Sequence, residues 1–336
     1  MILYNPECDL RLTEYGIEIP VADDRGSRVF SSMLEIDSTL TYFDLKNIPI
    51  LTQKDLLFAH DFDFVSRLFG NEDELQEEIM TCYELIDNYG NYFRYNPLKA
   101  KNNFNQMFKI ILQQAGMTYL STKNALKNGF SYYLGGGMHH AMSFQGRGFC
   151  LINDLVIGLR KLQKEKLIQS AWVIDVDAHK GDGTAELTQD DPSIVTLSLH
   201  MKKGWPLDSK EVSDPCFLPS NIDVTIDLNE ESLYLLKLKT ALLELEQNYK
   251  RPDIAIIVNG ADPFEHDELQ STEGLKLTKE QMLERDKMVY LFLKERNIPQ
   301  SYVMAGGYGK RSWEIYAQFL KFVWQYTSER SEVSSR

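Results

Sequence analysis

The sequence predicts a single α/β domain with a central parallel sheet and helices on both faces. From residue 130 onward, short apolar runs end in Gly, Asp, Asn or His, and longer amphipathic stretches separate them. Apolar strands that alternate with helices indicate a parallel sheet that is covered on both sides. No internal repeat or low-complexity block interrupts the 336 residues. We therefore expect one domain over residues 1–327 and a polar tail over 328–336.

The periodicity of the apolar residues places the elements. Helical spacing in the first third of the chain covers 54–69, 72–89 and 103–127, and these stretches carry no obvious chemistry. Because ligands of open parallel sheets bind beyond the carboxyl ends of the strands, we expect the functional site at that edge. The expected strands are 131–137, 171–177, 194–200, 222–227, 253–260 and 301–307, and the helices between them are 153–166, 230–249, 278–297 and 310–326.

Composition and charge argue against several classes of protein. Lys and Arg number 36 against 49 Asp and Glu, and the net charge of −13 argues against binding nucleic acid by neutralising its phosphates. It suits a cationic ligand, although many cytosolic enzymes are acidic for solubility alone. The first residues do not resemble a secretory signal, no stretch approaches the roughly 20 apolar residues of a membrane span, and the four cysteines are too scattered for a disulfide framework. We expect a cytoplasmic protein with neither nucleic-acid nor membrane partners, in an oligomeric state that the sequence leaves open.

A cluster of acidic residues and a histidine lies at the end of the second expected strand. Asp175, Asp177 and His179 stand at i, i+2 and i+4, so their side chains can converge as the strand leaves the sheet. Two carboxylates and an imidazole suit zinc or a neighbouring first-row metal. Asp262 ends another strand and is the natural third ligand, while Asp182 lies nearby. Each aspartate alone is explained as a helix cap or turn residue, but together they would repel one another without a cation.

Two further segments carry candidate chemistry. His139 and His140 follow three glycines, which permit a tight turn and close backbone approach to a ligand. Each imidazole can pair with a carboxylate, and Asp175 and Asp182 are available once Asp177 is assigned to the metal. Tyr308 stands between glycines after the last strand, where its hydroxyl can donate to a carbonyl oxygen. A turn or core role explains either segment taken alone.

Together these residues resemble the zinc-dependent histone deacetylase family, which includes bacterial acetylpolyamine amidohydrolases. The likeness covers roughly residues 130–311, in the order of the family's motifs, and implies the arginase/deacetylase-like fold. Within the family the sequence looks most like the class IV branch, through IDVDAHKGDG (174–183), ERDKMVY (284–290) and GGYGKR (306–311). The matching motifs are GGGMHHA (135–141), GRGFCLIND (146–154), VIDVDAHKGDGT (173–184), SLH (198–200), NGADP (259–263) and GGYGKR (306–311).

The resemblance implies a metal centre and a catalytic set. Asp177, His179 and Asp262 would hold Zn²⁺, for which iron or cobalt can substitute. His139 would pair with Asp175, and His140 with Asp182. The family hydrolyses N-acyl amides: the metal and Tyr308 polarise the acyl carbonyl while metal-bound water attacks. His140 would act as general base and then as acid, and His139 as an electrostatic partner.

The resemblance also implies features around this centre. Gly148 and Phe149 would line the tunnel for the lysine-like methylenes, with Trp205 opposite and with Gly306 and Gly307 at the substrate. A K⁺ ion would bind near the zinc through Asp175, Ser198 and Leu199, in a loop that also includes Asp177 and His179. Arg25 or Arg28 corresponds to the arginine of the family's internal cavity. Lys180 replaces the second histidine of many members, which changes the charge behind the metal.

Three alternatives stay open on sequence grounds. A dimanganese ureohydrolase needs an additional aspartate pair, and 258–261 reads Val-Asn-Gly-Ala instead. A non-catalytic protein that binds an acyl-lysine or amine ligand would show decay of the catalytic positions, and none is visible. The substrate can be acetyl-lysine in proteins, an acetylated polyamine or a longer acyl-lysine. The charged run 265–268 predicts an acidic rim that favours cationic substrates, or else a solvated loop.

Overall fold

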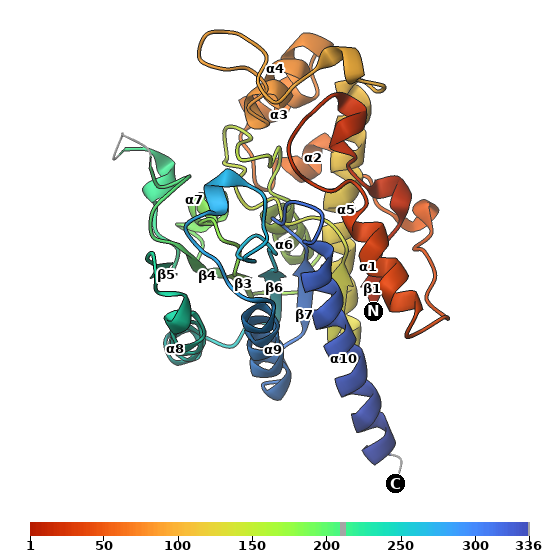
Figure 1. Ribbon diagram of the computed structural model, residues 1–336, viewed down its shortest axis with the longest axis vertical. Helices are drawn as coiled ribbons and strands as arrows, with labels where there is room; N and C mark the ends of the chain where they lie inside the picture. Colours follow the sequence, from red (N-terminus) through yellow and green to blue (C-terminus); the bar gives the residue numbers. More distant parts are fainter. Residues whose placement is uncertain (209–212, 335–336) are drawn as a thin grey trace.

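The computed structural model describes residues 1–208 and 213–334, and its centre is a seven-stranded sheet in which all strand pairs are parallel. The strand order is β1-β2-β7-β6-β3-β4-β5, and the five strands from β5 to β7 can be followed across Figure 1. All six expected strands are present. A seventh, β1, was not predicted because two residues give no periodic signal. The strands are β1 (Ile2–Leu3), β2 (Phe130–Tyr133), β3 (Ala171–Asp175), β4 (Ile194–Met201), β5 (Ile222–Ile226), β6 (Ile254–Val258) and β7 (Gln300–Val303).

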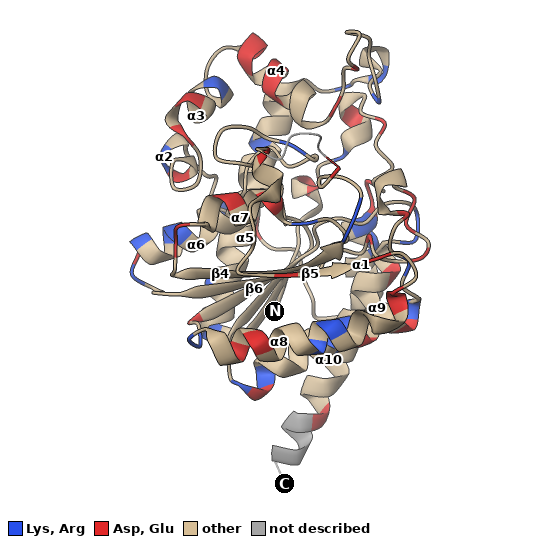
Figure 2. Ribbon diagram, turned by 90° about the vertical axis from the view of Figure 1, so that its left-hand side faces the viewer, with Lys and Arg blue, Asp and Glu red and all other residues tan. Residues whose placement is uncertain are grey.

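Helices cover both faces of the sheet, as predicted. On one face α5 (Phe104–Asn128) and α6 (Asp154–Lys164) pack together and against the strands. On the other face lie α8 (Tyr234–Asn248), α9 (Lys279–Glu295) and α10 (Trp313–Ser334), with α1 (Arg25–Leu34) beside α10. Figure 2 shows the sheet from its edge, between these two layers. The two apolar cores therefore lie on opposite sides of one sheet.

The N-terminal third forms a third packing unit above the sheet. Figure 1 shows α3 (Phe62–Leu68) and α4 (Glu72–Cys82) at the end of the molecule where the strands finish. The remaining described α-helices are the short helices α2 (Gln53–Leu56) and α7 (Asp182–Thr188). Buried side chains of α2 to α5 pack there against the segment 138–157 and against Tyr308. This unit covers the expected site.

Several expected helices have different bounds in the structure. The stretch 54–69 is divided into α2 and α3, and 72–89 is helical only to Cys82. The last helix begins at Trp313 and not at residue 310, because the backbone of the preceding glycine-rich turn is bonded to other loops. That helix continues into the polar segment as far as Ser334. The described ranges contain no helix with the length and apolarity needed to span a bilayer.

The break between α2 and α3 results from a buried histidine. The imidazole of His60 donates from Nδ1 to the carbonyl of Met142 at 2.8 Å, and its Nε2 accepts from the backbone N–H of Asn153 at 3.0 Å. Asn153 caps α6 through its side chain. Burial lowers the pKa of His60 to about 4, although both backbone carbonyl contacts favour the proton. The side chain is therefore neutral at pH 7 and bridges the first third of the chain to the sheet.

We expect His60→Gln to destabilise the protein at pH 7 by about 1–3 kcal/mol, because the Asn153 N–H loses its acceptor. The pKa of His60 is lower in the folded chain than its ordinary value of 6.5, so its stabilising contribution is complete above pH 6.5 and is lost as the pH falls toward 4. Urea unfolding at several pH values measures this. The difference between wild type and variant should shrink on acidification, whereas His266→Gln, at an exposed position, should show no such trend. A difference that stays constant from pH 7 to pH 4 contradicts the prediction.

Candidate active site

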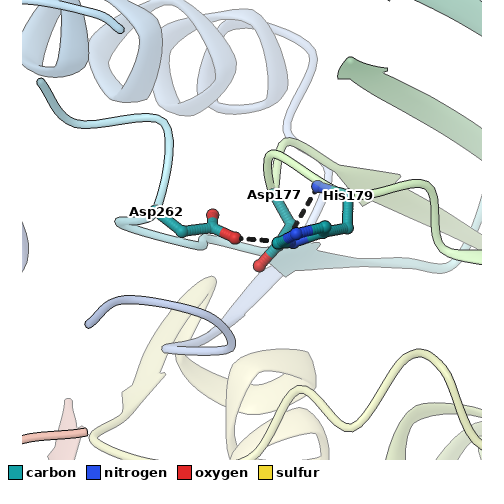
Figure 3. Close-up of side chains that lie close together, drawn as sticks. All are labelled: Asp177, His179 and Asp262. Atoms are coloured by element: carbon teal, nitrogen blue, oxygen red, sulfur yellow. Dashed lines mark hydrogen bonds and ion pairs between the residues drawn. The ribbon is translucent and has the colours of Figure 1, made fainter. Parts of the chain in front are cut away.

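The candidate metal ligands come together at the carboxyl edge of the sheet. Asp177 and His179 follow β3, and Asp262 follows the neighbouring strand β6. Ligand atoms of the three residues lie within 4.8 Å of one another, and all three side chains are buried. Figure 3 shows their polar ends converging, with Nδ1 of His179 at 3.3 Å from Asp177 Oδ1 and 3.0 Å from Asp262 Oδ2. The sequence predicted this juxtaposition.

Backbone groups orient the two carboxylates. The N–H of Gly306 donates to Asp177 Oδ2 at 3.0 Å, and the N–H of Ala178 donates to Asp262 Oδ1 at 3.0 Å. A Cβ at Gly306 would lie 2.6 Å from Asp177 Oδ2, so a side chain there would displace the ligand. Position 306 therefore has to be glycine for the segment after β7 to approach these carboxylates.

The electrostatics of the three residues fit a divalent cation. Burial and the charge of Asp177 raise the pKa of Asp262 to about 8. Burial alone would lower the pKa of His179, but its hydrogen bonds to both carboxylates and their charges raise it to about 10. The two carboxylates thus share one protonated imidazole. A metal ion that binds to the three residues displaces the proton. Two oxygen donors and one nitrogen donor suit Zn²⁺, Fe²⁺ or Co²⁺ and leave room for a water or substrate.

The two adjacent histidines have separate carboxylate partners. His139 donates from Nδ1 to Asp175 Oδ2 at 2.6 Å, and His140 donates from Nδ1 to Asp182 Oδ1 at 2.6 Å. The ring centroids lie 3.9 Å apart, so a positive charge on one ring disfavours a positive charge on the other. Burial would lower the pKa of His139, but the charges of Asp175 and Asp177 raise it to about 9. Burial and the charge of His139 lower the pKa of His140 to about 4.

A tunnel of about 170 Å³ connects these groups with the surface. Trp205 stands edge-on to His140, with ring centroids 4.5 Å apart, and Phe149 lies 6.3 Å from Tyr308. A Cβ at Gly148 would contact Trp205 and His140, so this position admits only glycine. The predicted tunnel residues Gly148, Phe149 and Trp205 thus lie together. The lining residues are Glu84, Arg94, His140, Gly148, Phe149, His179, Trp205, Leu269, Ser271 and Tyr308.

A second cavity of about 140 Å³ borders His139, His140 and Tyr308. Arg25 lines it and donates to the carbonyl of Gly307 at 3.0 Å. Arg28 instead donates to the carbonyl of Lys310 at 2.8 Å and covers the ring of Trp313. Of the two candidate arginines, the structure therefore places Arg25 at the cavity. Gly306 also lines this cavity, whereas Gly307 lines neither it nor the tunnel.

The expected potassium ligands lie directly behind the metal site. Asp175 and Ser198 are register partners on β3 and β4, and Leu199 follows on β4. The Ser198 hydroxyl accepts from the Gly181 N–H at 3.3 Å. Lys180 is buried nearby, and its ammonium group donates to Asp223 at 2.6 Å. The positive charge introduced by Lys180 is thus neutralised inside the fold. Potassium binding itself stays a prediction.

The charged run 265–268 does not line the tunnel. The carboxylate of Asp267 accepts from the Tyr308 N–H at 2.7 Å, and Glu268 accepts from the Lys310 N–H at 3.2 Å. Both side chains therefore hold the loop that carries Tyr308. The charged groups at the tunnel mouth are Glu84 and Arg94 instead. They come from a segment without a motif, and only the fold reveals their position.

A buried arginine behind the metal loops also carried no signal of function in the sequence. Arg285 on α9 is fully buried and donates to the carbonyls of Val176 at 3.0 Å and Gly260 at 2.8 Å. It also donates to Asp286 at 2.8 Å. One guanidinium thus joins the two loops that present the metal ligands. In the sequence, Arg285 stands out only because Arg285 and Asp286 form a charged pair within the apolar pattern of the run 284–290.

Fold and site together define an α/β protein with a buried Asp-His-Asp centre and a histidine pair at the end of a tunnel. Comparison with family models gives a match to the histone deacetylase domain over residues 19–323. The chain belongs to the histone deacetylase family. This membership was predicted from the motifs, while the likeness to the class IV branch stays a prediction.

The chain is similar to several curated proteins. It is 33% identical over 199 residues to an uncharacterized protein of Picosynechococcus sp., covering 59% of this chain and 63% of that protein. It is 29% identical over 209 residues to histone deacetylase 2 of Arabidopsis thaliana, covering 62% of this chain and 52% of the plant protein. Acetoin utilization protein AcuC of Staphylococcus aureus is 26% identical over 272 residues, 79% of this chain and 66% of that protein. The first two matches thus span less than two thirds of those relatives.

A solved structure shares the fold. The crystal structure of the HDA15 HD domain superposes with a TM-score of 0.68 over 96% of this chain and 90% of that one, at 16% sequence identity. The expected arginase/deacetylase-like fold is therefore confirmed.

The structure weakens the dimanganese alternative. In the described part of the chain, Asp177, His179 and Asp262 form the only group of three or more clustered His, Cys, Asp or Glu ligands. Asn259, where a second metal would need a carboxylate, bonds to Tyr132 and Asp286 instead.

We expect Zn²⁺ to stabilise the wild-type protein against heat and Asp262→Asn to abolish that effect. A ligand at about 1,000 times its dissociation constant stabilises by about 4 kcal/mol, and removing one of three ligands weakens the binding. Differential scanning fluorimetry with and without metal measures the shift. Asp63→Asn, at an exposed position of α3, should retain the full shift. Equal shifts in wild type and Asp262→Asn would place the metal elsewhere.

We expect Arg285→Met to lower the free energy of unfolding by about 3–5 kcal/mol, because it leaves the buried Asp286 carboxylate without its cation. Guanidinium unfolding measures this loss. Lys294→Met, at an exposed position of the same helix, should change stability by less than about 0.5 kcal/mol. A loss for Arg285→Met no larger than that of the control would contradict the role of Arg285.

Proposed function

We propose that the protein is a zinc-dependent amidohydrolase that removes acetyl or longer acyl groups from lysine side chains or related amines. The observation that carries the proposal is the pair of adjacent histidines, each hydrogen-bonded through Nδ1 to its own buried carboxylate, beside three candidate metal ligands at the end of a narrow tunnel. Family membership supports a deacetylase activity. A soluble amine or an acyl-lysine polypeptide then enters through the tunnel.

The residues divide the proton transfers between them. Zn²⁺ held by Asp177, His179 and Asp262 would supply Lewis-acid activation of the acyl carbonyl and of the attacking water. His140 is neutral and hydrogen-bonded through Nδ1 only, so its Nε2 can take a proton and return it to the leaving amine.

His139 and Tyr308 support the developing negative charge. The raised pKa of His139 keeps it protonated near the reacting carbonyl, where a cation stabilises an oxyanion. Burial raises the pKa of Tyr308 far above its ordinary value, so the hydroxyl keeps its proton and can donate to the carbonyl oxygen. Asp267 holds the backbone of Tyr308 in place for this contact.

The tunnel walls account for the substrate's shape. Phe149 and Trp205 offer apolar surface for a chain of methylenes, and the second cavity offers space beside the acyl group. The proposal includes a K⁺ site at Asp175, Ser198 and Leu199. It also includes a cytoplasmic location, which the four buried free cysteines support.

We expect Tyr308→Phe to lower kcat by about 10²–10³, as removal of one oxyanion donor does, and His140→Ala to abolish turnover. The assay is hydrolysis by the Zn²⁺-loaded protein of a panel of acetyl-lysine peptide, acetylputrescine, acetylspermidine and myristoyl-lysine peptide. Tyr249→Phe and His266→Ala, outside the tunnel, are the matched controls and should keep wild-type rates.

The outcomes separate enzyme from binding protein. Turnover that depends on Tyr308 and His140 supports the deacylase mechanism and selects the substrate class. If the folded, metal-loaded protein turns over no member of the panel, the proposed activity is refuted for these substrates and a binding role gains support.

A further inference from the structure

Arg94 stands where two hollows of the surface meet. One is the tunnel of about 170 Å³, and the other is an open groove of about 450 Å³ beside its mouth. Arg94, Trp205 and Ser271 line both. A substrate whose acylated side chain fills the tunnel therefore leaves its remaining atoms next to Arg94, at the entrance of the groove.

The guanidinium of Arg94 retains free hydrogen-bonding capacity. Its Nη1 donates to Glu84 Oε2 at 2.8 Å, and no acceptor for its Nε or Nη2 is found in the described residues. The group lies over the rings of Phe93 at 4.8 Å and Phe149 at 5.7 Å, with its side chain 28% exposed. An arginine fork that lies over aromatic rings and keeps two donor groups is suited to bind a carboxylate through two parallel hydrogen bonds.

The backbone holds Arg94 in a costly conformation. Its φ of 52° lies in the left-handed region, which side chains with a Cβ adopt rarely. The carbonyl of Arg94 accepts from the Glu18 N–H at 2.8 Å, and the next residue, Tyr95, forms a bridge with Ile17. The fold thus maintains local strain at a residue that faces the tunnel mouth, a pattern that is common where a side chain has a function.

The charges along the groove leave it open to an anion. Lys203 is exposed and has no ion-pair partner among the residues that the structure describes. The two carboxylates of the groove are already engaged: Asp227 bonds to Lys202 at 2.6 Å, and Asp208 accepts from the Gly204 N–H at 2.9 Å. Lys203 therefore has no ion-pair partner among the described residues, while Arg94 pairs with Glu84 through Nη1 and keeps its Nε and Nη2 as donors.

We propose that this groove is a carboxylate subsite, in which Arg94 and Lys203 bind an acidic side chain next to the acylated lysine of a polypeptide substrate. The inference rests on the proposed function, and it selects among the substrates left open there. An acetylated polyamine carries further ammonium groups, which would lie beside Arg94 and be repelled. The carboxylate can come from a neighbouring Asp or Glu or from the lysine's own free α-carboxylate, and experiment separates the two.

The test compares three matched substrates. They are a capped acetyl-lysine peptide with Asp on each side of the lysine, the same peptide with Lys in place of Asp, and free Nε-acetyl-lysine. Acetylspermidine is the fourth. We measure kcat/KM at low and high salt for wild type, Arg94→Gln and Lys203→Gln. Arg251→Gln is the control, because it removes the same charge from the loop before β6, at the amino ends of the strands.

We expect the wild type to prefer the Asp peptide over the Lys peptide by about fivefold at low salt, near the upper range for exposed charge pairs. The preference should lie in KM and should shrink at high salt. Arg94→Gln should remove most of it, and Lys203→Gln part of it, whereas Arg251→Gln should retain it. Faster turnover of free acetyl-lysine that depends on Arg94 would assign the subsite to the α-carboxylate and overturn the side-chain assignment.

An Asp-to-Lys ratio that is the same in wild type and Arg94→Gln overturns the proposal, as does a wild-type preference for acetylspermidine over the Asp peptide. Binding of the fluorescein-labelled peptides, followed by anisotropy, is independent of turnover. An Arg94-dependent preference in binding without any hydrolysis would refute the proposed activity and still support the subsite. Equal binding of the Asp and Lys peptides would refute the subsite even if both are hydrolysed.

Discussion

Four carboxylates buried at one edge of a parallel sheet are the constraint on which the rest of this structure depends. Asp175, Asp177, Asp182 and Asp262 are each at most 3% exposed. Charges buried so close together are tolerated only when counter-charges and hydrogen bonds compensate them. The chain supplies a histidine for Asp175, another for Asp182, and one shared imidazole for the remaining pair. That last pair shares one cation between two carboxylates, and this shortage of positive charge suits the group to a metal ion.

The nearby carboxylates also give the two adjacent histidines different pKa values. His139 faces two carboxylates, which favour its proton, while His140 has one carboxylate and a charged imidazole 3.9 Å away. Their chemistry therefore differs although they are neighbours in sequence with the same local motif. The opposite shifts of the two pKa values arise from which carboxylate each ring reaches, and the strand order of the sheet decides that. Lys180 is compensated in the same way, because its buried ammonium group forms an ion pair with Asp223.

Much of this edge could be predicted from sequence because its signals are local. The apolar runs marked the strands, and the residues directly after them formed the site. The elements that sequence reasoning missed depend on contacts between distant segments. The two-residue strand β1 exists only through its pairing with β2, and the helix expected at 54–69 is broken because His60 bonds to loops more than 80 residues away. The contacts of Arg285 with the loops after β3 and β6 likewise depend on how α9 packs against them.

The buried site and the tunnel mouth are held in place by different kinds of structure. The metal ligands and the paired histidines lie at strand ends, where the parallel ladder and its backbone hydrogen bonds fix their positions. The tunnel mouth is built from separate loops, which contribute Arg94, Phe149 and Trp205. Loops tolerate substitution better than a buried ladder does. Chemistry and substrate choice can therefore change independently, since a new rim leaves the compensated carboxylates untouched. Under the proposed function, a cation at this rim would hold the carboxylate of an acidic substrate outside the tunnel, next to Arg94, and leave the uncharged acyl-lysine side chain to enter the centre that is itself crowded with carboxylates.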